Sequence, residues 1–275
     1  MHVSVSDIIA LNNQHLFKKR EDVIIKKYFG LVKKVTEQQK NRMKKGAELE
    51  DTILKYSIED IQRTFKIKSI SPQVEYRIDF NNEIEILGYA DLVIETEFAD
   101  IIIEAKNTSM NIIDPYSIPK YYIWQVLIYK YMHETITQRQ VIPMLAIRTK
   151  KNISLYWLNS YLIYELSNKS NKNFFNIEKF IKTGLFFLNK VKIIEGCDEY
   201  FDYYLKLQKT NDEFEMDYIE YLLNKKDKEY GGIHALYISE KFKDYFIFRN
   251  FIINLQGERY TYRRLINKKY YERKD

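Results

Sequence analysis

Two neighbouring apolar stretches, residues 84–94 and 100–106, constrain the fold of this chain more than any other feature. Both are rich in isoleucine, leucine and valine, and the charged turn 95–100 separates them. Short apolar runs of this composition, joined by a polar turn, are typical of paired β-strands. The sequence therefore predicts a β-hairpin whose strands belong to a buried sheet.

Three of the charged side chains in these runs stand out, because they are expected near the centre of the sheet. Asp91 lies in the first run, and Glu104 and Lys106 lie in the second, where alternation places both on one face of the strand. Desolvating an unpaired charge is costly, so a buried sheet carries such residues only where they are paired or bound to something. Two carboxylates facing a lysine would make a site for a hard cation. The alternative is structural, with Asp91 at a strand end and Glu104 and Lys106 as an ion pair on an exposed face.

Two further segments carry polar residues at helical spacing. Residues 121–132 are predicted to form a helix that presents Gln125 and Tyr129, four positions apart, on one face. Upstream, Gly46 and Glu50 have the same four-residue spacing in another segment of helical pattern. Each predicted helix therefore offers polar groups on one face.

The order of these elements resembles the PD-(D/E)XK nuclease superfamily, and in particular its RecB-like branch. The two half-motifs of the superfamily fall on Asp91 and on residues 104–106. The Gln-x-x-x-Tyr helix of the branch falls within residues 121–132, directly after the lysine strand. Its Gly-x-x-x-His element falls on Gly46, but Glu50 stands where the family has histidine.

The resemblance covers residues 1 to about 160 and implies an α/β fold, with a restriction-endonuclease-like core in which helices flank a central mixed sheet. Within the superfamily, the CRISPR-associated spacer-adaptation nucleases are similar in size and motif order. Those proteins usually hold an iron–sulfur cluster on four cysteines, whereas this chain has a single cysteine, Cys197. We therefore expect no iron–sulfur cluster, no intramolecular disulfide and no cysteine zinc site.

The resemblance also implies a role for each matching residue. The implied catalytic and positioning residues are Asp91, Glu104, Lys106, Gln125 and Tyr129. The implied metal ligands are Glu50, Asp91, Glu104 and the carbonyl oxygen of Ala105. An all-oxygen set suits Mg²⁺, whereas an imidazole favours softer ions such as Mn²⁺. Alternatively, Glu50 is only a surface acid, or Glu48 or Asp51 takes its place.

Two basic segments are candidates for contact with DNA. Residues 18–45 are rich in lysine and end in Lys44 and Lys45, just before the Glu50 helix. The C-terminal segment 259–274 interleaves basic residues with tyrosines, which can track a phosphate backbone and stack on bases. The tail residues assigned to DNA binding are Arg263, Arg264, Lys268 and Lys269. A solvated helix face would explain the first run equally well, and tyrosine is abundant throughout the chain, at 24 residues.

Composition favours an intracellular protein. The net charge of +6 is modest and does not by itself identify a nucleic-acid binder. No stretch has the ~18–20 uninterrupted apolar residues of a membrane span, and the N-terminus lacks a signal-peptide pattern. We therefore expect a cytoplasmic protein without a membrane partner.

The chain is predicted to contain a nuclease core at residues 1–165 and a helical extension at 166–275. Residues 140–148 and 153–158 are expected to continue the sheet as a second strand pair. The extension matches no motif and could be a lid, a dimerisation surface or a docking module. Its segments with helical spacing are 174–194, 198–209, 212–224 and 234–254.

The expected function is that of a Mg²⁺- or Mn²⁺-dependent DNA nuclease that hydrolyses phosphodiester bonds in recombination, DNA-end processing or defence. Its expected substrates are single-stranded DNA or duplex ends. The chain has no P-loop, so unwinding would require a helicase or recombination partner. The alternatives are a catalytically inactive DNA-binding protein and a protein-interaction factor on the same fold.

Overall fold

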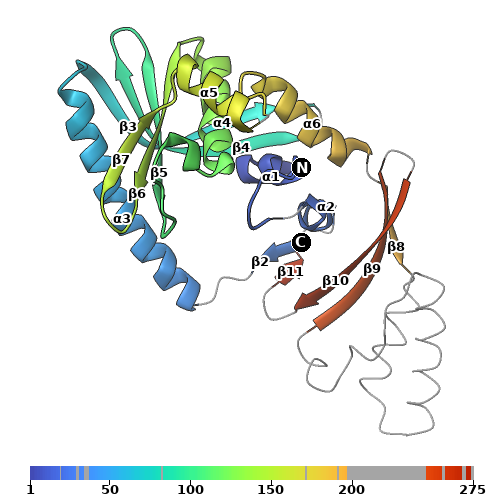
Figure 1. Ribbon diagram of the computed structural model, residues 1–275. Coiled ribbons are helices and arrows are strands. Elements are labelled where there is room, and N and C mark those ends of the chain that lie inside the picture. The colour runs from blue at the N-terminus through green and yellow to red at the C-terminus, as the bar shows by residue number, and fades with distance from the viewer. Residues whose placement is uncertain are drawn as a thin grey trace, which may run out of the picture. The chain divides into compact units, whose positions relative to one another are not determined.

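The computed structural model describes residues 1–18, 20–28, 31–33, 37–81, 83–170, 172–190, 192–196, 246–255, 258–267 and 271–273 (Figure 1). The chain forms two compact units, each built from separate segments. The first unit comprises Met1–Val23 and Glu37–Leu185, and the second comprises Ile24–Thr36 and Phe186–Asp275. The boundary expected at residue 165 falls inside a helix of the first unit.

A mixed six-stranded sheet forms the centre of the first unit. Its strands are β1 (His2–Ser4), β3 (Ile67–Asp79), β4 (Glu85–Thr96), β5 (Asp100–Asn107), β6 (Val141–Arg148) and β7 (Ile153–Trp157). The order is β1-β4-β5-β6-β7, and β3 pairs with β4. The hairpin predicted from the apolar stretches is present as β4 and β5, and the second predicted pair is present as β6 and β7.

Helices flank this sheet on both faces, so the expected fold class is confirmed. The helices are α1 (Val5–Leu11), α2 (Arg20–Tyr28), α3 (Glu37–Gln62), α4 (Lys120–Thr137), α5 (Ser160–Ser170) and α6 (Ile177–Lys190), with a 3-10 turn η1 (Pro115–Ser117). Strands β5 and β6 are parallel, and such a pair requires a crossover connection. Helix α4 provides it and contains the predicted helix 121–132.

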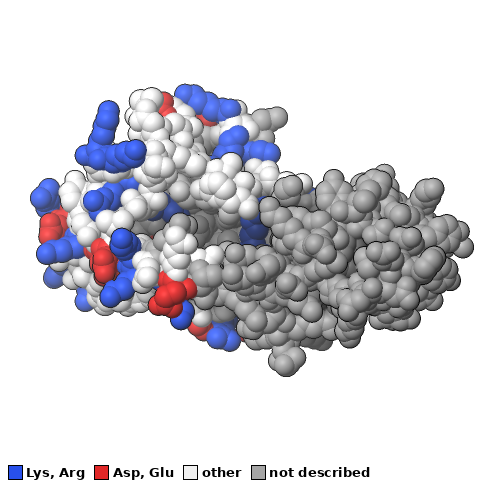
Figure 2. Space-filling view, turned by 90° about the horizontal axis from the view of Figure 1, so that it is seen from below, with Lys and Arg blue, Asp and Glu red and all other residues white. Residues whose placement is uncertain are grey.

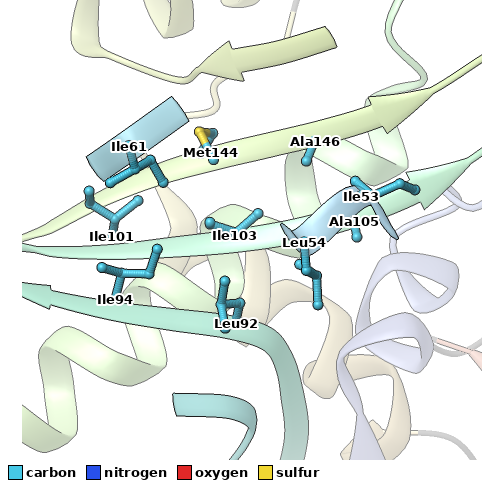
Figure 3. Close-up of a cluster of buried hydrophobic side chains, with 10 residues drawn as sticks. All are labelled: Ile53, Leu54, Ile61, Leu92, Ile94, Ile101, Ile103, Ala105, Met144 and Ala146. Atoms are coloured by element: carbon cyan, nitrogen blue, oxygen red, sulfur yellow. The ribbon is translucent and has the colours of Figure 1, made fainter. Parts of the chain in front are cut away.

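Helix α3 packs on one face of the sheet through an entirely apolar cluster (Figure 3). Its contribution is Ile53, Leu54 and Ile61, all buried. The sheet contributes Leu92, Ile94, Ile101, Ile103, Ala105, Met144 and Ala146. Because Ile103 and Ala105 face α3, alternation directs Glu104 and Lys106 to the opposite face, where α4 lies.

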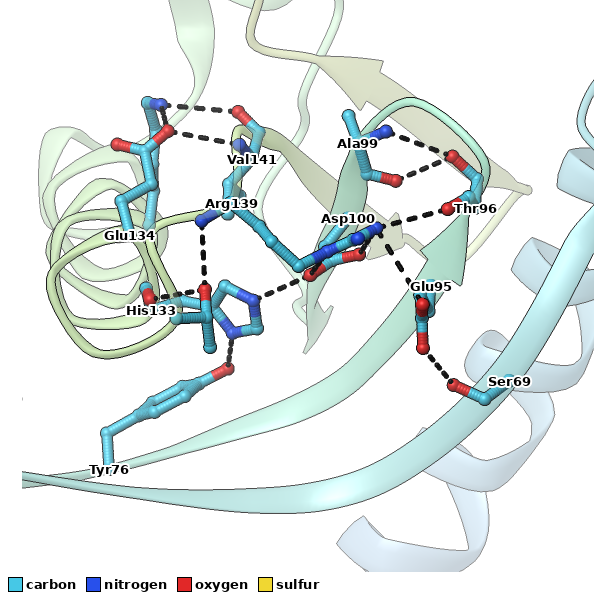
Figure 4. Close-up of polar contacts among 12 residues, drawn as sticks. Ser69, Tyr76, Glu95, Thr96, Ala99, Asp100, His133, Glu134, Arg139 and Val141 are labelled. Atoms are coloured by element: carbon cyan, nitrogen blue, oxygen red, sulfur yellow. Dashed lines mark hydrogen bonds and ion pairs between the residues drawn. The ribbon is translucent and has the colours of Figure 1, made fainter.

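A buried polar network fixes α4 to that opposite face (Figure 4). Arg139 donates two hydrogen bonds to Asp100, each 2.9 Å long, and His133 Nε2 lies 2.8 Å from the same carboxylate. A carboxylate only accepts, so Nε2 is the donor, and Nδ1 accepts from the Tyr76 hydroxyl at 2.8 Å. Strand β3, strand β5 and the C-terminal end of α4 are thereby joined.

The described part of the second unit contains two sheets, besides the ends of α2 and α6. β8 (Lys192–Gly196), β9 (Phe246–Leu255) and β10 (Glu258–Asn267) form an antiparallel sheet, and β2 (Leu31–Lys33) pairs with β11 (Tyr271–Arg273). The helical prediction for 234–254 is wrong over residues 246–254. Aromatic and β-branched residues dominate this segment and favour a strand once a partner strand is present. The helix predicted at 174–194 ends at Lys190 and is followed by β8, while segments 198–209 and 212–224 lie outside the described residues.

Candidate active site

The candidate site lies where β4 separates from β5. The ladder between these strands runs from Glu95↔Asp100 to Leu92↔Ile103 and stops there. On the same edge of β4, β1 pairs only as far as Leu87. Figure 3 shows β4 curving away from β5 next to Leu92. The two ladders therefore leave a gap in the sheet beside residues 88–91, and Asp91 stands at its edge.

At this gap the side chain of Asp91, rather than the backbone of β4, accepts a hydrogen bond from β5. Its Oδ2 accepts a hydrogen bond of 2.8 Å from the backbone N–H of Ala105 in β5. Burial raises the pKa of Asp91, while Lys106 and the Ala105 N–H partly oppose the increase. The hydrogen bond holds the carboxyl group of Asp91 beside the second half-motif.

Glu104 and Lys106 share one face of β5, as alternation predicted, and Lys106 Nζ donates to Glu104 Oε1. Glu104 is only 1% exposed, and its other oxygen, Oε2, is buried without a hydrogen-bond partner. Burial raises the pKa of Glu104 to about 8, and repulsion from Asp91 acts in the same direction against the attraction of Lys106. Burial disfavours the charge on Lys106, but Glu104 and Asp91 more than offset this and raise its pKa. The lysine therefore carries its charge at neutral pH, whereas burial favours the protonated form of Glu104.

Gln125 and Tyr129 lie on one face of α4, as predicted, and Gln125 Nε2 is 3.3 Å from the Tyr129 hydroxyl. Helix α4 approaches β4 closely at Gly88. A Cβ at that position would lie 2.7 Å from Cε1 of Tyr129 and 2.9 Å from Cγ2 of Val5. Glycine is thus required so that the Tyr129 ring can pack over the gap in the sheet. Burial raises the pKa of Tyr129, and Glu104 adds to the increase, so the hydroxyl stays protonated.

Glu50 reaches the site from α3, on the other side of the sheet. It is half-buried and accepts a hydrogen bond of 2.9 Å from Gln73 Nε2. Burial and the charge of Asp91 raise the pKa of Glu50, against the attraction of Lys106. Glu48 and Asp51, the alternatives to Glu50, are exposed.

Gln73 is a site residue that the sequence analysis missed. It lies in β3 between the pairs Pro72↔Leu92 and Val74↔Ala90, which places it opposite Asp91. Its φ of 50° is left-handed, and its side chain acts to lower the pKa of Asp91, against the effect of burial. Proline within a strand is a sign of irregular pairing, so Pro72 was the signal available in the sequence.

The donor chemistry fits a hard divalent cation. Three carboxyl groups with raised pKa values interact electrostatically here, and one buried carboxylate oxygen has no partner. Within the described residues, however, no three His, Cys, Asp or Glu side chains are grouped closely enough to hold a metal ion. Two contacts keep these carboxyl groups apart. Lys106 Nζ donates to Glu104 Oε1, and Gln73 Nε2 donates to Glu50 on the α3 side of the sheet.

Aromatic side chains form one wall next to Lys106. Its Nζ lies 5.5 Å from the centre of the Tyr122 ring, and Tyr122 contacts Tyr121 at 4.4 Å between ring centres. Tyr121 in turn contacts His15 at 5.1 Å and Phe17 at 6.5 Å, and Phe17 is 76% exposed. These rings extend from the buried lysine to the surface.

The residues expected to bind DNA belong to different units of the chain. Lys44 and Lys45 are exposed on α3, whereas Arg263 and Arg264 lie in β10 of the other unit. Lys268 and Lys269, like Cys197, lie outside the described residues. On the face shown in Figure 2, Lys and Arg are spread over several places with acids among them.

Comparison with known proteins gives only distant structural likeness. No family model and no curated protein sequence matches the chain. The solved structure of SSO0001 matches with a TM-score of 0.40 and 15% identity over 67% of this chain and 75% of that one. A "Putative exonuclease" from Eubacterium rectale matches with a TM-score of 0.36 and 13% identity, over 67% and 81% of the two chains. None of the helices in the described ranges is both long and apolar enough to cross a membrane.

Proposed function

We propose that this protein is a metal-dependent DNA nuclease that hydrolyses phosphodiester bonds at the site formed by Asp91, Glu104 and Lys106. One observation carries the proposal: Glu104 is buried with one oxygen on Lys106 and the other without a partner, directly beside Asp91. A buried acid in this state needs a proton or a cation. The surrounding motifs resemble those of the RecB-like PD-(D/E)XK nucleases, and this resemblance favours a bound cation over a proton.

Asp91, Glu104 and the Ala105 carbonyl would hold Mg²⁺ or Mn²⁺, with Glu50, which Gln73 orients through Oε1, as a further ligand. A bound cation would polarise the scissile phosphate and lower the pKa of an attacking water. The Lys106 ammonium would stabilise negative charge that develops on the phosphate, in a site where burial strengthens electrostatic interactions. Gln125 and Tyr129 would keep the carboxyl groups in place from α4.

Single-stranded DNA and duplex ends are the substrates we propose, in recombination, DNA-end processing or defence within the cytoplasm. The exposed end of the aromatic wall, Phe17, offers a surface on which an unpaired base could stack near Lys106. A helicase or recombination partner would supply any unwinding.

The test is cleavage of labelled single- and double-stranded DNA, linear and circular, with Mg²⁺, Mn²⁺ or EDTA. We expect cleavage with either metal and none with EDTA. Asp91→Ala and Lys106→Ala should each reduce the rate by about 10²-fold or more, since each removes a charge from the reacting centre. Asp60→Ala, which removes an exposed acid of α3, is the matched control and should retain full activity.

A second candidate function is DNA binding without catalysis. It is favoured by the absence of any three grouped ligand side chains in the described part of the chain. DNA binding that survives Lys106→Ala, with no cleavage by either protein under any metal, would select this function and reject the nuclease.

A further inference from the structure

A surface pocket of about 300 Å³ lies between α1, α4 and α6 in the first unit. Its lining includes Trp124, Lys172, Asn173, Asn176, Lys179 and Thr183, and no aspartate or glutamate. It shares no residue with the Asp91 site. A ligand bound in this pocket would therefore be independent of the proposed nuclease activity.

The walls of this pocket are held by close packing between α6 and α1. A Cβ at Gly184 would lie 2.6 Å from Asn12 Nδ2, so glycine allows α6 to approach α1. Asn12 Nδ2 donates to the carbonyls of Ile8 at 3.0 Å and Phe180 at 2.9 Å, which fixes both helices. The Phe180 ring stacks on Trp124 at 3.7 Å between ring centres, with 9° between the planes. The pocket is therefore preformed rather than created by a ligand.

The polar groups that remain in the pocket are mainly donors. Asn173 Oδ1 accepts from the backbone N–H of Phe175, and Asn176 Oδ1 accepts from that of Lys179, each at 3.1 Å. These bonds orient both amides, so that the NH₂ groups are left to donate. Neither Lys172 nor Lys179 pairs with an acid in the described part of the chain, and helix α6 begins at Ile177 with its positive dipole end here.

Trp124, which contributes to the pocket lining, is itself almost fully buried. Trp124 is 2% exposed, and its Nε1 has no hydrogen-bond partner within the described residues. Because Nε1 is shielded from solvent, it is not among the groups that a ligand in the pocket would contact. The position of Trp124 in the lining makes its indole a reporter of what binds there.

We propose that this pocket binds the phosphate group of a nucleotide-sized ligand. The ammonium groups of Lys172 and Lys179, two oriented amides and a helix N-terminus all favour an anion that carries several acceptor oxygens. The volume exceeds that of a lone phosphate and falls at the lower end of the range for small-molecule sites. The absence of acids from the lining excludes a cation as the preferred ligand.

The test uses the fluorescence of Trp124 as a reporter inside the pocket. The chain has two tryptophans, so Trp157→Phe leaves Trp124 as the only one. This variant is titrated at constant ionic strength with a deoxynucleoside 5′-monophosphate, with inorganic phosphate and with the unphosphorylated deoxynucleoside. Calorimetric titration of the unaltered protein with the same ligands measures the same affinities without the Trp157→Phe change. It therefore applies even if that variant does not fold. We expect saturable binding of the monophosphate and none of the nucleoside.

Charge variants locate the binding site. Replacing both Lys172 and Lys179 by alanine should weaken binding of the monophosphate by about tenfold or more, because two charge-assisted contacts are lost. Lys182→Ala is the matched control on the same helix, since Lys182 pairs with Glu178 and does not line the pocket. Lys106→Ala should also leave binding unchanged, which separates this pocket from the proposed active site.

Each outcome decides the proposal. Binding of phosphate and monophosphate identifies a phosphate site, and binding of the monophosphate alone adds recognition of the nucleoside part. Equal binding of nucleoside and monophosphate overturns the proposal. So does full affinity in the double lysine variant, or no binding at all.

Discussion

Gln73 shows how a single residue connects the two sides of the candidate site. Its φ of 50° is unfavourable for a residue with a side chain and typically costs about 1–3 kcal/mol. The regular pairs on both sides, Pro72↔Leu92 and Val74↔Ala90, hold this conformation in place. The amide then donates a hydrogen bond to Glu50 on α3 and acts to lower the pKa of Asp91 on β4. Gln73 is thus a positioning residue for two of the proposed metal ligands.

Gln73→Gly should separate the backbone effect from the side-chain effect. Glycine adopts positive φ without strain, so we expect the melting temperature to be maintained or raised. The lost amide should raise the Mg²⁺ concentration needed for half-maximal cleavage by about 10–100-fold, as removal of a group that orients metal ligands does. Gln73→Asn is the control, because asparagine tolerates this conformation and keeps an amide. An unchanged Mg²⁺ requirement in the glycine variant would show that Gln73 does not position the ligands.

At this scale the sequence predicted those contacts that depend on local periodicity. The shared face of Glu104 and Lys106 follows from the period of a strand, and the contact of Gln125 with Tyr129 follows from the period of a helix. Gln73 could not be predicted in the same way, because its conformation is imposed by the pairing of β3 with β4.

Among the elements, α4 and the β4–β5 hairpin are joined by the network of Tyr76, Asp100, His133 and Arg139 (Figure 4). Burial alone would raise the pKa of Asp100, but the hydrogen bonds from Arg139 and His133 lower it below its ordinary value of 3.8. A carboxyl group with a lowered pKa in the folded state stabilises the fold above its unfolded pKa. That contribution is lost as the pH falls through the folded pKa, which lies below 3.8.

Asp100→Asn should therefore destabilise the protein in a pH-dependent way. Loss of about 1 kcal/mol of charge-assisted bonding would lower the melting temperature near pH 7 by roughly 2–4 °C. The difference from the unaltered protein should shrink as the pH falls below 3.8, because Asp100 is then protonated as well. Thermal unfolding, followed by circular dichroism at a series of pH values, measures this difference in melting temperature. Asp60→Asn, which changes an exposed acid, is the control. A difference that stays constant with pH would mean that the charge of Asp100 contributes nothing.

Helix α3 contains a glycine that its packing does not require. Gly46 lies in the helix interior, is exposed, and a Cβ there would meet nothing within 4 Å. Glycine inside a helix costs about 1 kcal/mol relative to alanine, so Gly46→Ala should raise the melting temperature by roughly 2–4 °C. If DNA approaches α3 next to Glu50, the added methyl group should also slow cleavage. Gain of stability with undiminished cleavage would place the DNA elsewhere.

The elements that the sequence predicted correctly are those with a strong local pattern. The hairpin of β4 and β5, the pair β6 and β7, and helix α4 all formed as expected. β9 was mistaken for a helix, because a short apolar run without clear alternation satisfies both periods. Pairing with β8 and β10 selects the strand over the helix, and β8 is distant from β9 in the sequence.

At the scale of the whole molecule, neither unit is a continuous piece of sequence. The second unit takes residues 24–36 from the N-terminal part, where β2 pairs with β11 near the C-terminus. The first unit extends to Leu185 and so includes most of α6. The boundary expected from the sequence was residue 165, but the buried side chains of α6, among them Ile181 and Leu185, belong to the first unit.

A chain ending at residue 165 should therefore fail to fold cooperatively, whereas one ending at residue 190 should retain the first unit. The shorter chain lacks Phe174 and Leu185, which are 1% and 0% exposed, and it exposes Trp124, on which Phe174 and Phe180 pack. Each large buried side chain that is lost costs about 2–5 kcal/mol, against a total stability of roughly 5–15 kcal/mol for a typical domain. Both chains lack the partner of β2, so the comparison isolates α5 and α6. A cooperative thermal transition in the 1–165 chain, with Trp124 emission as in the longer one, would show that α6 is dispensable to the core.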